Sequence, residues 1–114
     1  MTDYSKMNDR DIDRLVLKVI YGVHADDKDI QDCWSRGGFK YTTNPTEAWS
    51  IIDDNEIALL PSTDFGWVAI SGLMLNGCSS YIDQRLDSCF QHSDTNPLRA
   101  AMIVFLQMQE NNHD

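Results

Sequence analysis

The chain has 114 residues, of which 42% are hydrophobic and 24% are charged, so it suits one globular domain spanning residues 1–114 and excludes a disordered chain. Its 18 Asp and Glu residues outnumber 9 Lys and Arg residues and give a net charge of −9, which disfavours direct binding to the phosphates of nucleic acid. Three cysteines cannot all pair within one chain, and no run approaches the roughly 20 apolar residues that span a bilayer, so a cytoplasmic protein that stays off the membrane is expected.

The first predicted helix begins after Asn8, whose side chain can cap it, and ends at Gly22. Asp9 and Asp11 in its first turn suit the positive end of the helix dipole. Apolar residues recur at helical spacing and predict the buried face of this helix: Ile12, Leu15, Val16, Val19 and Ile20. The residues predicted to face solvent are Asp13, Arg14 and Lys18.

Residues 24–41 show no regular spacing of apolar residues and are predicted to form a loop with at most one short edge strand. Trp34 and Phe39 are expected to pin this loop to the core, because isolated aromatic residues in polar segments usually bury their rings. The acidic run at residues 26–29 lacks the alternating oxygen ligands and closing Glu of a calcium loop. It is therefore interpreted as a solvated acidic segment.

A second helix is predicted to start at Asn44, with Asn44 as its cap and Glu47 reaching back as in a capping box, and to stop near residues 53–55. Two β-favouring runs follow at residues 57–60 and 67–71. Because a short polar turn separates them, they predict an antiparallel pair of strands.

The dipeptide Asn76-Gly77 is typical of a two-residue hairpin turn and predicts a further strand within residues 80–91. The last helix is predicted over residues 97–109, after the cap Asn96, and a frayed polar tail is expected at residues 111–114.

Residues 100–106 of this last helix are seven consecutive apolar residues, so most of its circumference must be buried. Either the helix is the central one of the domain, or one side of it meets a second copy in a homodimer through the 97–109 helix. Together the elements predict an α+β fold, with three helices packed on a small antiparallel sheet of two to four strands.

Three stretches of the chain resemble segments of one known family. They are the opening Asp3-Tyr4-Ser5-Lys6-Met7-Asn8-Asp9, the middle Asn44-Pro45-Thr46-Glu47-Ala48-Trp49-Ser50-Ile51-Ile52, and the closing Asn96-Pro97-Leu98-Arg99-Ala100-Ala101-Met102-Ile103-Val104-Phe105-Leu106. They are similar to segments of the NinX-like family, small proteins of unknown function from lambdoid phages of enteric bacteria. Members more often have Pro where Ser50 stands. The resemblance implies an accessory protein in the cytoplasm of an infected bacterium, and it implies no catalytic or binding residues.

Cys89 and His92 have the Cys-x-x-His spacing of two zinc ligands, with Cys33 and Cys78 or His24 completing a set of four. A zinc site normally shows two such close pairs and only one is present, so structural thiols and a surface histidine are the favoured interpretation. A cysteine nucleophile with a histidine base is a weaker alternative, because no local signature accompanies it. No cofactor is expected, since the chain contains no phosphate-binding glycine loop or dinucleotide fingerprint.

Arg99 lies in the first turn of the last helix, where its positive charge opposes the helix dipole. With the cap Asn96 it is a weak candidate for binding an anion or an acidic group of a partner. Pairing of Arg99 with a neighbouring acid such as Asp94 is the favoured interpretation. Trp34, Trp49 and Trp67 could line a peptide groove. Core positions are the favoured interpretation, because large aromatic residues in so small a domain are usually buried.

The function predicted from these observations is a non-enzymatic phage accessory protein whose acidic surface binds a host or phage protein with a basic surface. Mimicry of nucleic acid, to occupy a DNA-binding host protein, is a special case of that function. The alternative is a small thiol- or zinc-dependent protein that uses Cys33, Cys78, Cys89 and His92. Solubility alone is the simplest explanation of the acidic charge.

Overall fold

Four α-helices and a three-stranded antiparallel sheet make up the part of the chain that the computed structural model describes, residues 3–64, 66–72 and 90–111. Two short 3-10 helices, η1 and η2, precede and follow the first α-helix. In chain order the elements are η1 (Tyr4–Lys6), α1 (Asp9–Tyr21), η2 (Gly22–Asp26), α2 (Lys28–Ser35), α3 (Pro45–Asp54), β1 (Ile57–Ser62), β2 (Gly66–Ser71), β3 (Gln91–Asp94) and α4 (Pro97–Asn111). The predicted α+β fold class is confirmed.

The sheet has β2 at its centre, in the order β1-β2-β3. β1 and β2 pair antiparallel from Ile57 opposite Ser71 to Ser62 opposite Gly66, which confirms the predicted pair. Gly66 has a φ of 82°, and a Cβ on it would lie 2.8 Å from the Cα of Thr95. Only glycine therefore lets the chain that leaves β3 pass so close to the start of β2.

The third strand begins at Gln91, the last residue of the range predicted to contain it, and pairs with β2 from Trp67 opposite Asp94 to Ile70 opposite Gln91. The turn predicted at Asn76-Gly77 and most of the range 80–91 lie outside the described residues.

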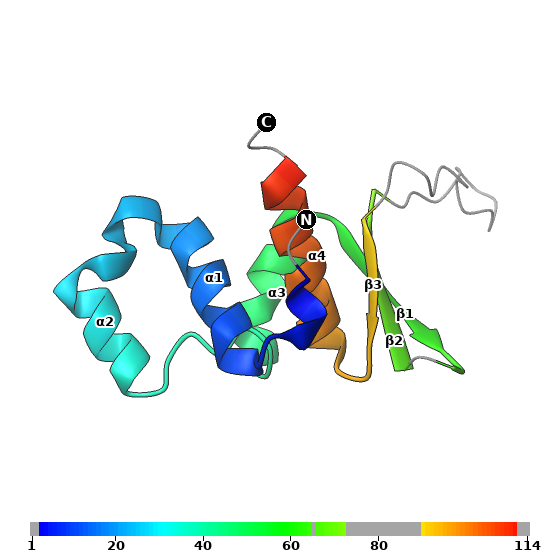
Figure 1. Cartoon of the computed structure of the whole chain (residues 1–114), viewed down its shortest axis with the longest axis horizontal. Helices are drawn as coiled ribbons and strands as arrows, with labels where there is room; N and C mark the ends of the chain where they lie inside the picture. The colour runs from blue at the N-terminus through cyan, green and yellow to red at the C-terminus, as the bar shows by residue number, and fades with distance from the viewer. Residues whose placement is uncertain (1–2, 65, 73–89, 112–114) are drawn as a thin grey trace.

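α4 lies between the sheet and α1, and all the helices lie on one side of the sheet (Figure 1). Residues 100–106 are all buried, because the strands cover one side of α4 while α1 and α3 cover the other. The prediction that this is the central helix is confirmed. The same chain covers the apolar run, and the homodimer predicted through the 97–109 helix stays a prediction. Residues 112–114 of the predicted tail lie outside the described residues.

The loop predicted over residues 24–41 is wrong, because this segment contains η2 and the eight-residue helix α2. Asp27 stands at the N-cap position of α2 and Asp29 in its first turn, where carboxylates complement the helix dipole. The helix has too few apolar residues for its spacing to stand out in the sequence. Trp34 and Phe39 pack against the core, as predicted.

α3 begins as predicted, with the Asn44 side chain accepting a hydrogen bond from the Thr46 amide at 3.0 Å. Glu47, however, does not reach back to Asn44. Its carboxylate accepts hydrogen bonds from the backbone amides of Phe39, at 3.3 Å, and Lys40. The predicted capping box is thus replaced by a contact that fastens α3 to the segment after α2.

The buried face of α1 differs from the predicted one. Ile12 and Val16 are buried as expected, but the other buried residues are Asp13 and Leu17, and Leu15 is only half-buried. Val19 and Ile20 are exposed, because the C-terminal end of α1 leads away from α4 toward η2 (Figure 1). The C-terminal end of α1 therefore exposes apolar side chains that the helical spacing predicted to be buried.

Asp13, predicted to face solvent, is 1% exposed and joins α1 to the chain before α3. Its Oδ1 accepts hydrogen bonds from the backbone amide and the hydroxyl of Thr42, both at 2.9 Å. Nη1 of Arg10 lies 3.3 Å from Asp13 Oδ2, and the Arg10 guanidinium stacks on Trp34 at 3.6 Å from the ring centre. Burial raises the pKa of Asp13, although the hydrogen bonds from Thr42 and Arg10 act in the opposite direction.

The raised pKa of Asp13 predicts a pH-dependent part of the stability. Because the native state binds this proton more tightly than the unfolded state, the contribution of Asp13 to stability is fully present below its unfolded pKa of 3.8. It is lost as the pH rises through the raised native pKa. We expect the free energy of unfolding of the wild type, minus that of Asp13→Asn, to fall over this pH range in urea denaturation. Asp32→Asn, at an exposed aspartate, is the control. The prediction would be contradicted if the difference in free energy of unfolding between the wild type and the variant fell equally for Asp13→Asn and Asp32→Asn.

Candidate functional site

Arg99 is a structural clamp at the start of α4. Its side chain is 12% exposed, and its three guanidinium nitrogens all donate to oxygens of the same chain. Nε donates to Asp94 Oδ2 at 3.0 Å and Nη1 to Asp9 Oδ1 at 2.8 Å. Nη2 donates to the backbone carbonyls of Ser5, at 3.2 Å, and Met7. Arg99 thus joins α4 to the end of β3, to η1 and to the first turn of α1.

Asn96 fastens the same end of α4 to a second part of the chain. Its Oδ1 accepts hydrogen bonds from the amides of Leu98, at 3.0 Å, and Arg99, at 3.4 Å, while its Nδ2 donates to the carbonyl of Thr42 at 2.6 Å. The predicted helix cap and the predicted pairing of Arg99 with Asp94 are confirmed. The two residues considered for anion or partner binding therefore stabilise the fold in this arrangement.

The candidate zinc ligands do not form one cluster in the described part of the chain. Cys33 is an exposed free thiol on α2, and His92 is half-buried on β3, at the opposite end of the molecule (Figure 1). Burial lowers the pKa of His92, an effect that the neighbouring Asp94 partly offsets. Cys78 and Cys89 lie outside the described residues, and a site that joins them to His92 stays a prediction.

Within residues 3–64, 66–72 and 90–111, no three His, Cys, Asp or Glu side chains are arranged to hold a metal ion. In these same ranges, no helix combines the length and the apolar character needed to cross a membrane.

The three tryptophans stand on separate elements and do not line one groove. Trp34 packs on Arg10 in the half-buried face of α2, and Trp67 is half-buried on β2. Trp49, on α3, is 62% exposed, although a tryptophan in so small a domain was expected in the core. In the sequence, Trp49 stands beside the apolar stripe of α3 and not within it. This position on the helix turns its side chain away from the core.

The outer face of α3 is acidic around this tryptophan. Asp53 follows Trp49 by four residues and so lies next to it on the helix surface. Asp53 and Asp54 are both exposed in the last turn, where no basic residue stands, and the exposed Glu56 follows. These carboxylates add to the negative end of the helix dipole and create a negative potential beside an exposed aromatic ring. We call Trp49, Asp53, Asp54 and Glu56 the α3 face.

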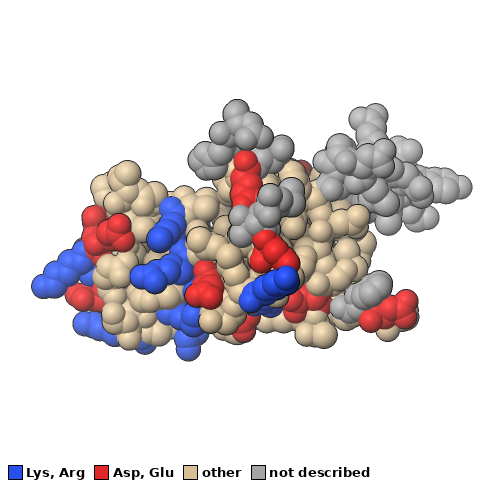
Figure 2. Space-filling model, viewed as in Figure 1, with Lys and Arg blue, Asp and Glu red and all other residues tan. Residues whose placement is uncertain are grey.

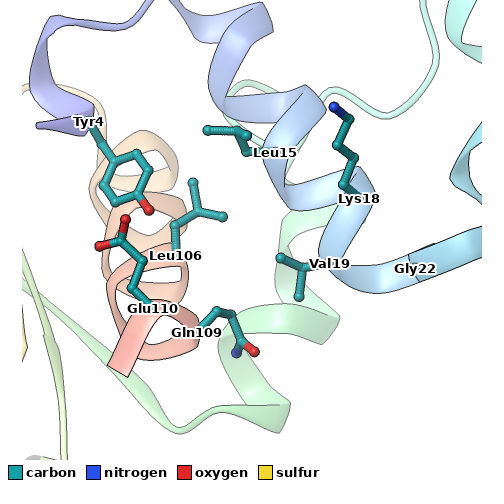
Figure 3. A pocket seen from close by; sticks show the side chains of 8 residues that line it. All are labelled: Tyr4, Leu15, Lys18, Val19, Gly22, Leu106, Gln109 and Glu110. Carbon is teal, nitrogen blue, oxygen red and sulfur yellow. The ribbon is translucent and has the colours of Figure 1, made fainter. Parts of the chain in front are cut away.

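An open groove of about 490 Å³ runs between α1 and α4 (Figure 3). Leu15 and Val19 of α1 face Tyr4 and Leu106 across it, and Gly22 lies at one end. Polar side chains stand at its edges, with Lys18 on α1 and with Gln109 and Glu110 on α4. On the α1 side the groove is lined by Leu15 and Val19, which the helical spacing predicted to be buried in the core.

The charges divide the chain into two unlike parts. Residues 1–40 contain 8 acidic and 7 basic residues, whereas residues 41–114 contain 10 acidic and 2 basic residues. In Figure 2 most Lys and Arg side chains accordingly lie over the end of the molecule formed by α1 and α2. Of the residues after position 40 that the structure describes, 7 are acidic and 1 is basic, so α3, the sheet and α4 with their connections carry an acidic excess.

The comparisons with known proteins identify one family. A family model described as "Bacteriophage P22, NinX" matches residues 3–109, which include every α-helix and strand named above apart from the last two residues of α4. No curated protein and no solved structure matches the chain.

The clamp around Arg99 predicts that this residue governs stability. Arg99→Lys should lower the free energy of unfolding by about 2–4 kcal/mol, because an ammonium group cannot serve two carboxylates and several carbonyls in the planar geometry of a guanidinium. Arg36→Lys, at the exposed arginine that follows the last residue of α2, is the matched control and should change the free energy of unfolding by less than about 0.5 kcal/mol. Urea denaturation measures both. Equal stability of the two variants would show that Arg99 does not clamp the fold.

Proposed function

The chain belongs to the bacteriophage P22 NinX family, and from that premise we propose that it is a non-enzymatic phage accessory protein that binds a basic host or phage protein. It acts in the cytoplasm of the infected bacterium and requires no cofactor. The family assignment supplies the phage setting, and its molecular function is unknown. The proposed binding function comes from the surface of the molecule.

The observation that carries the proposal is the exposure of Trp49 on the α3 face. Large aromatic side chains are usually buried in small domains, and tryptophan is enriched among the residues that dominate binding energy at protein interfaces. α3 buries Ala48, Ile51 and Ile52 against the core, so the helix would be stable without an aromatic residue on its other side. Trp49 is therefore available to a partner at little cost to the fold.

The charge around Trp49 specifies the chemistry of the partner. Asp53, Asp54 and Glu56 favour a positively charged surface, and the ring of Trp49 offers a face on which a cation can stack. Arginine satisfies both requirements, because its guanidinium stacks on aromatic rings and pairs with carboxylates at the same time. The partner site proposed for the α3 face therefore contains exposed arginines. A DNA-binding protein whose basic site is occupied in this way is a special case.

The test is a pull-down from lysate of phage-infected bacteria with the tagged chain, at low and high salt. Trp49→Ala should reduce recovery of the specific partner by at least about tenfold, because the variant removes the aromatic anchor. Asp53→Asn combined with Asp54→Asn should also weaken recovery at low salt and make it less dependent on salt, because it removes two of the attracting charges.

The matched control is Asp29→Asn combined with Asp32→Asn on α2, which changes the net charge equally but away from the α3 face (Figure 1). It should retain the partner. Equal losses for the two double variants would show that only the net charge matters, and the absence of a specific partner at either salt would refute the proposal. Release of the partner by added DNA would identify the mimicry case.

A further inference from the structure

The segment from Gly22 to Gly38, which contains η2 and α2, lies apart from the core of the protein. All of its residues are described, and none of them belongs to the cluster of buried side chains that forms the core. Ala25 is buried but lies outside this cluster, while Ile30 and Trp34 of α2 pack against the cluster and stay half-buried. Figure 1 shows η2 and α2 at the end of the molecule that lies away from the sheet. We call residues 22–38 the α2 arm.

The two ends of the α2 arm meet and are fixed to the rest of the fold. The rings of Tyr21 and Phe39, the residues just before and just after the arm, contact edge to face with their centres 5.6 Å apart. The Glu47 carboxylate on α3 accepts hydrogen bonds from the amides of Phe39, at 3.3 Å, and Lys40. Because both ends are held at one place, the arm can leave the core while α1 and α3 stay where they are.

Glycines at the two ends of the arm give the backbone the freedom for such a movement. Gly22 has a φ of 56°, and a Cβ on it would have no described atom within 4 Å. Gly37 has a φ of 88°, and a Cβ on it would meet the end of the Lys40 side chain at 3.6 Å. Both positions therefore use glycine for its backbone conformation and not to permit a close approach. Hinges commonly consist of a few such residues at the ends of elements.

Arg10 on α1 makes several contacts to the C-terminal end of the arm. Its guanidinium stacks on the Trp34 ring, 3.6 Å from the ring centre, and donates to the backbone carbonyls of Trp34 and Gly38 at 3.4 and 3.3 Å. A cation at this end of α2 also complements the negative end of the helix dipole. Arg10 is itself held by the buried Asp13, 3.3 Å away, whose other oxygen binds Thr42.

We infer that the α2 arm opens as one unit while the rest of the fold stays closed, and that Arg10 is the residue that holds it closed. Opening exposes Ile30 and Trp34 and breaks the stack of Trp34 on Arg10. The pairs of Asp13 with Arg10 and Thr42 lie outside the arm and persist. Since the core cluster and the sheet remain intact, opening requires only a part of the free energy of global unfolding. This inference does not depend on the function proposed for the α3 face.

Amide hydrogen exchange of the purified chain, followed residue by residue by NMR, tests the inference. The hydrogen-bonded amides of the arm, among them those of Gln31, Arg36 and Gly38, should exchange together and with one common dependence on urea. Their opening should be at least about 100-fold more frequent than that of residues 100–106 in α4. Equal protection of the arm and α4 would overturn the inference. So would rates that rise from residue to residue toward the ends of α2, because they would indicate fraying in place of a single opening.

Arg10→Lys tests how the arm is held, because an ammonium group keeps the charge beside Asp13 but cannot stack on Trp34 and donate to several carbonyls in one plane. It should speed exchange of the arm about tenfold and leave α4 unchanged. The matched control is Arg14→Lys, at an exposed arginine one turn further along α1, whose guanidinium lies 6.0 Å from the centre of the Trp34 ring. It should change exchange of the arm by less than about twofold.

Trp34→Leu is a second variant that leaves Arg10 and Asp13 in place and removes only the ring on which Arg10 stacks. It should also speed exchange of the arm, by at least about threefold, with α4 unchanged. Equal effects of Arg10→Lys and Arg14→Lys on the arm would overturn the role of Arg10. If Arg10→Lys and Trp34→Leu sped exchange of α4 as much as that of the arm, the segment would be part of the global fold, and the inference would be wrong.

Discussion

A helix with seven consecutive apolar residues has no face that it can turn to water, and this constraint organises the molecule. α4 meets it by lying between the sheet on one side and α1 and α3 on the other, so that residues 100–106 are buried all round. Burial alone would not fix how the surrounding elements are placed, because apolar contacts are not directional. The polar contacts of Asn96 and Arg99 supply the direction, since they join the start of α4 to η1, α1, β3 and the chain before α3.

The elements that sequence reasoning predicted are those with strong local signals. α1, α3 and α4 each begin at an asparagine cap and continue with helical spacing, and β1 and β2 are short β-favouring runs separated by a turn. α2 was missed because eight residues with few apolar positions give a weak period. The sequence nevertheless contained an aspartate at its N-cap position, Asp27, and two apolar residues one turn apart, Ile30 and Trp34. Local patterns thus predicted the fold class, three of the four described α-helices and the first two strands, but they missed α2 and both 3-10 helices and placed β3 too early in the chain.

The candidate site was less predictable, because its residues are defined by contacts between distant parts of the chain. The spacing of apolar residues shows which side chains share a helix face, but it does not show how far along the helix a neighbour covers that face. Asp13 is buried only because Thr42, 29 residues later, satisfies its carboxylate, and no local pattern announces this pair. Conversely, Val19 and Ile20 fit the predicted buried stripe but are exposed, because the end of α1 diverges from α4 and leaves an open groove between the two helices.

The net charge of −9 is not spread evenly along the chain. Residues 1–40, which supply α1 and α2, contain nearly equal numbers of acidic and basic residues, so the excess of carboxylates lies in residues 41–114. On α3, Asp53 and Asp54 are exposed in a last turn that holds no basic residue, and Trp49 stands exposed on the same helix. The proposed binding of a basic protein at the α3 face therefore rests on a local combination of charge and aromatic surface, which the net charge alone would not locate.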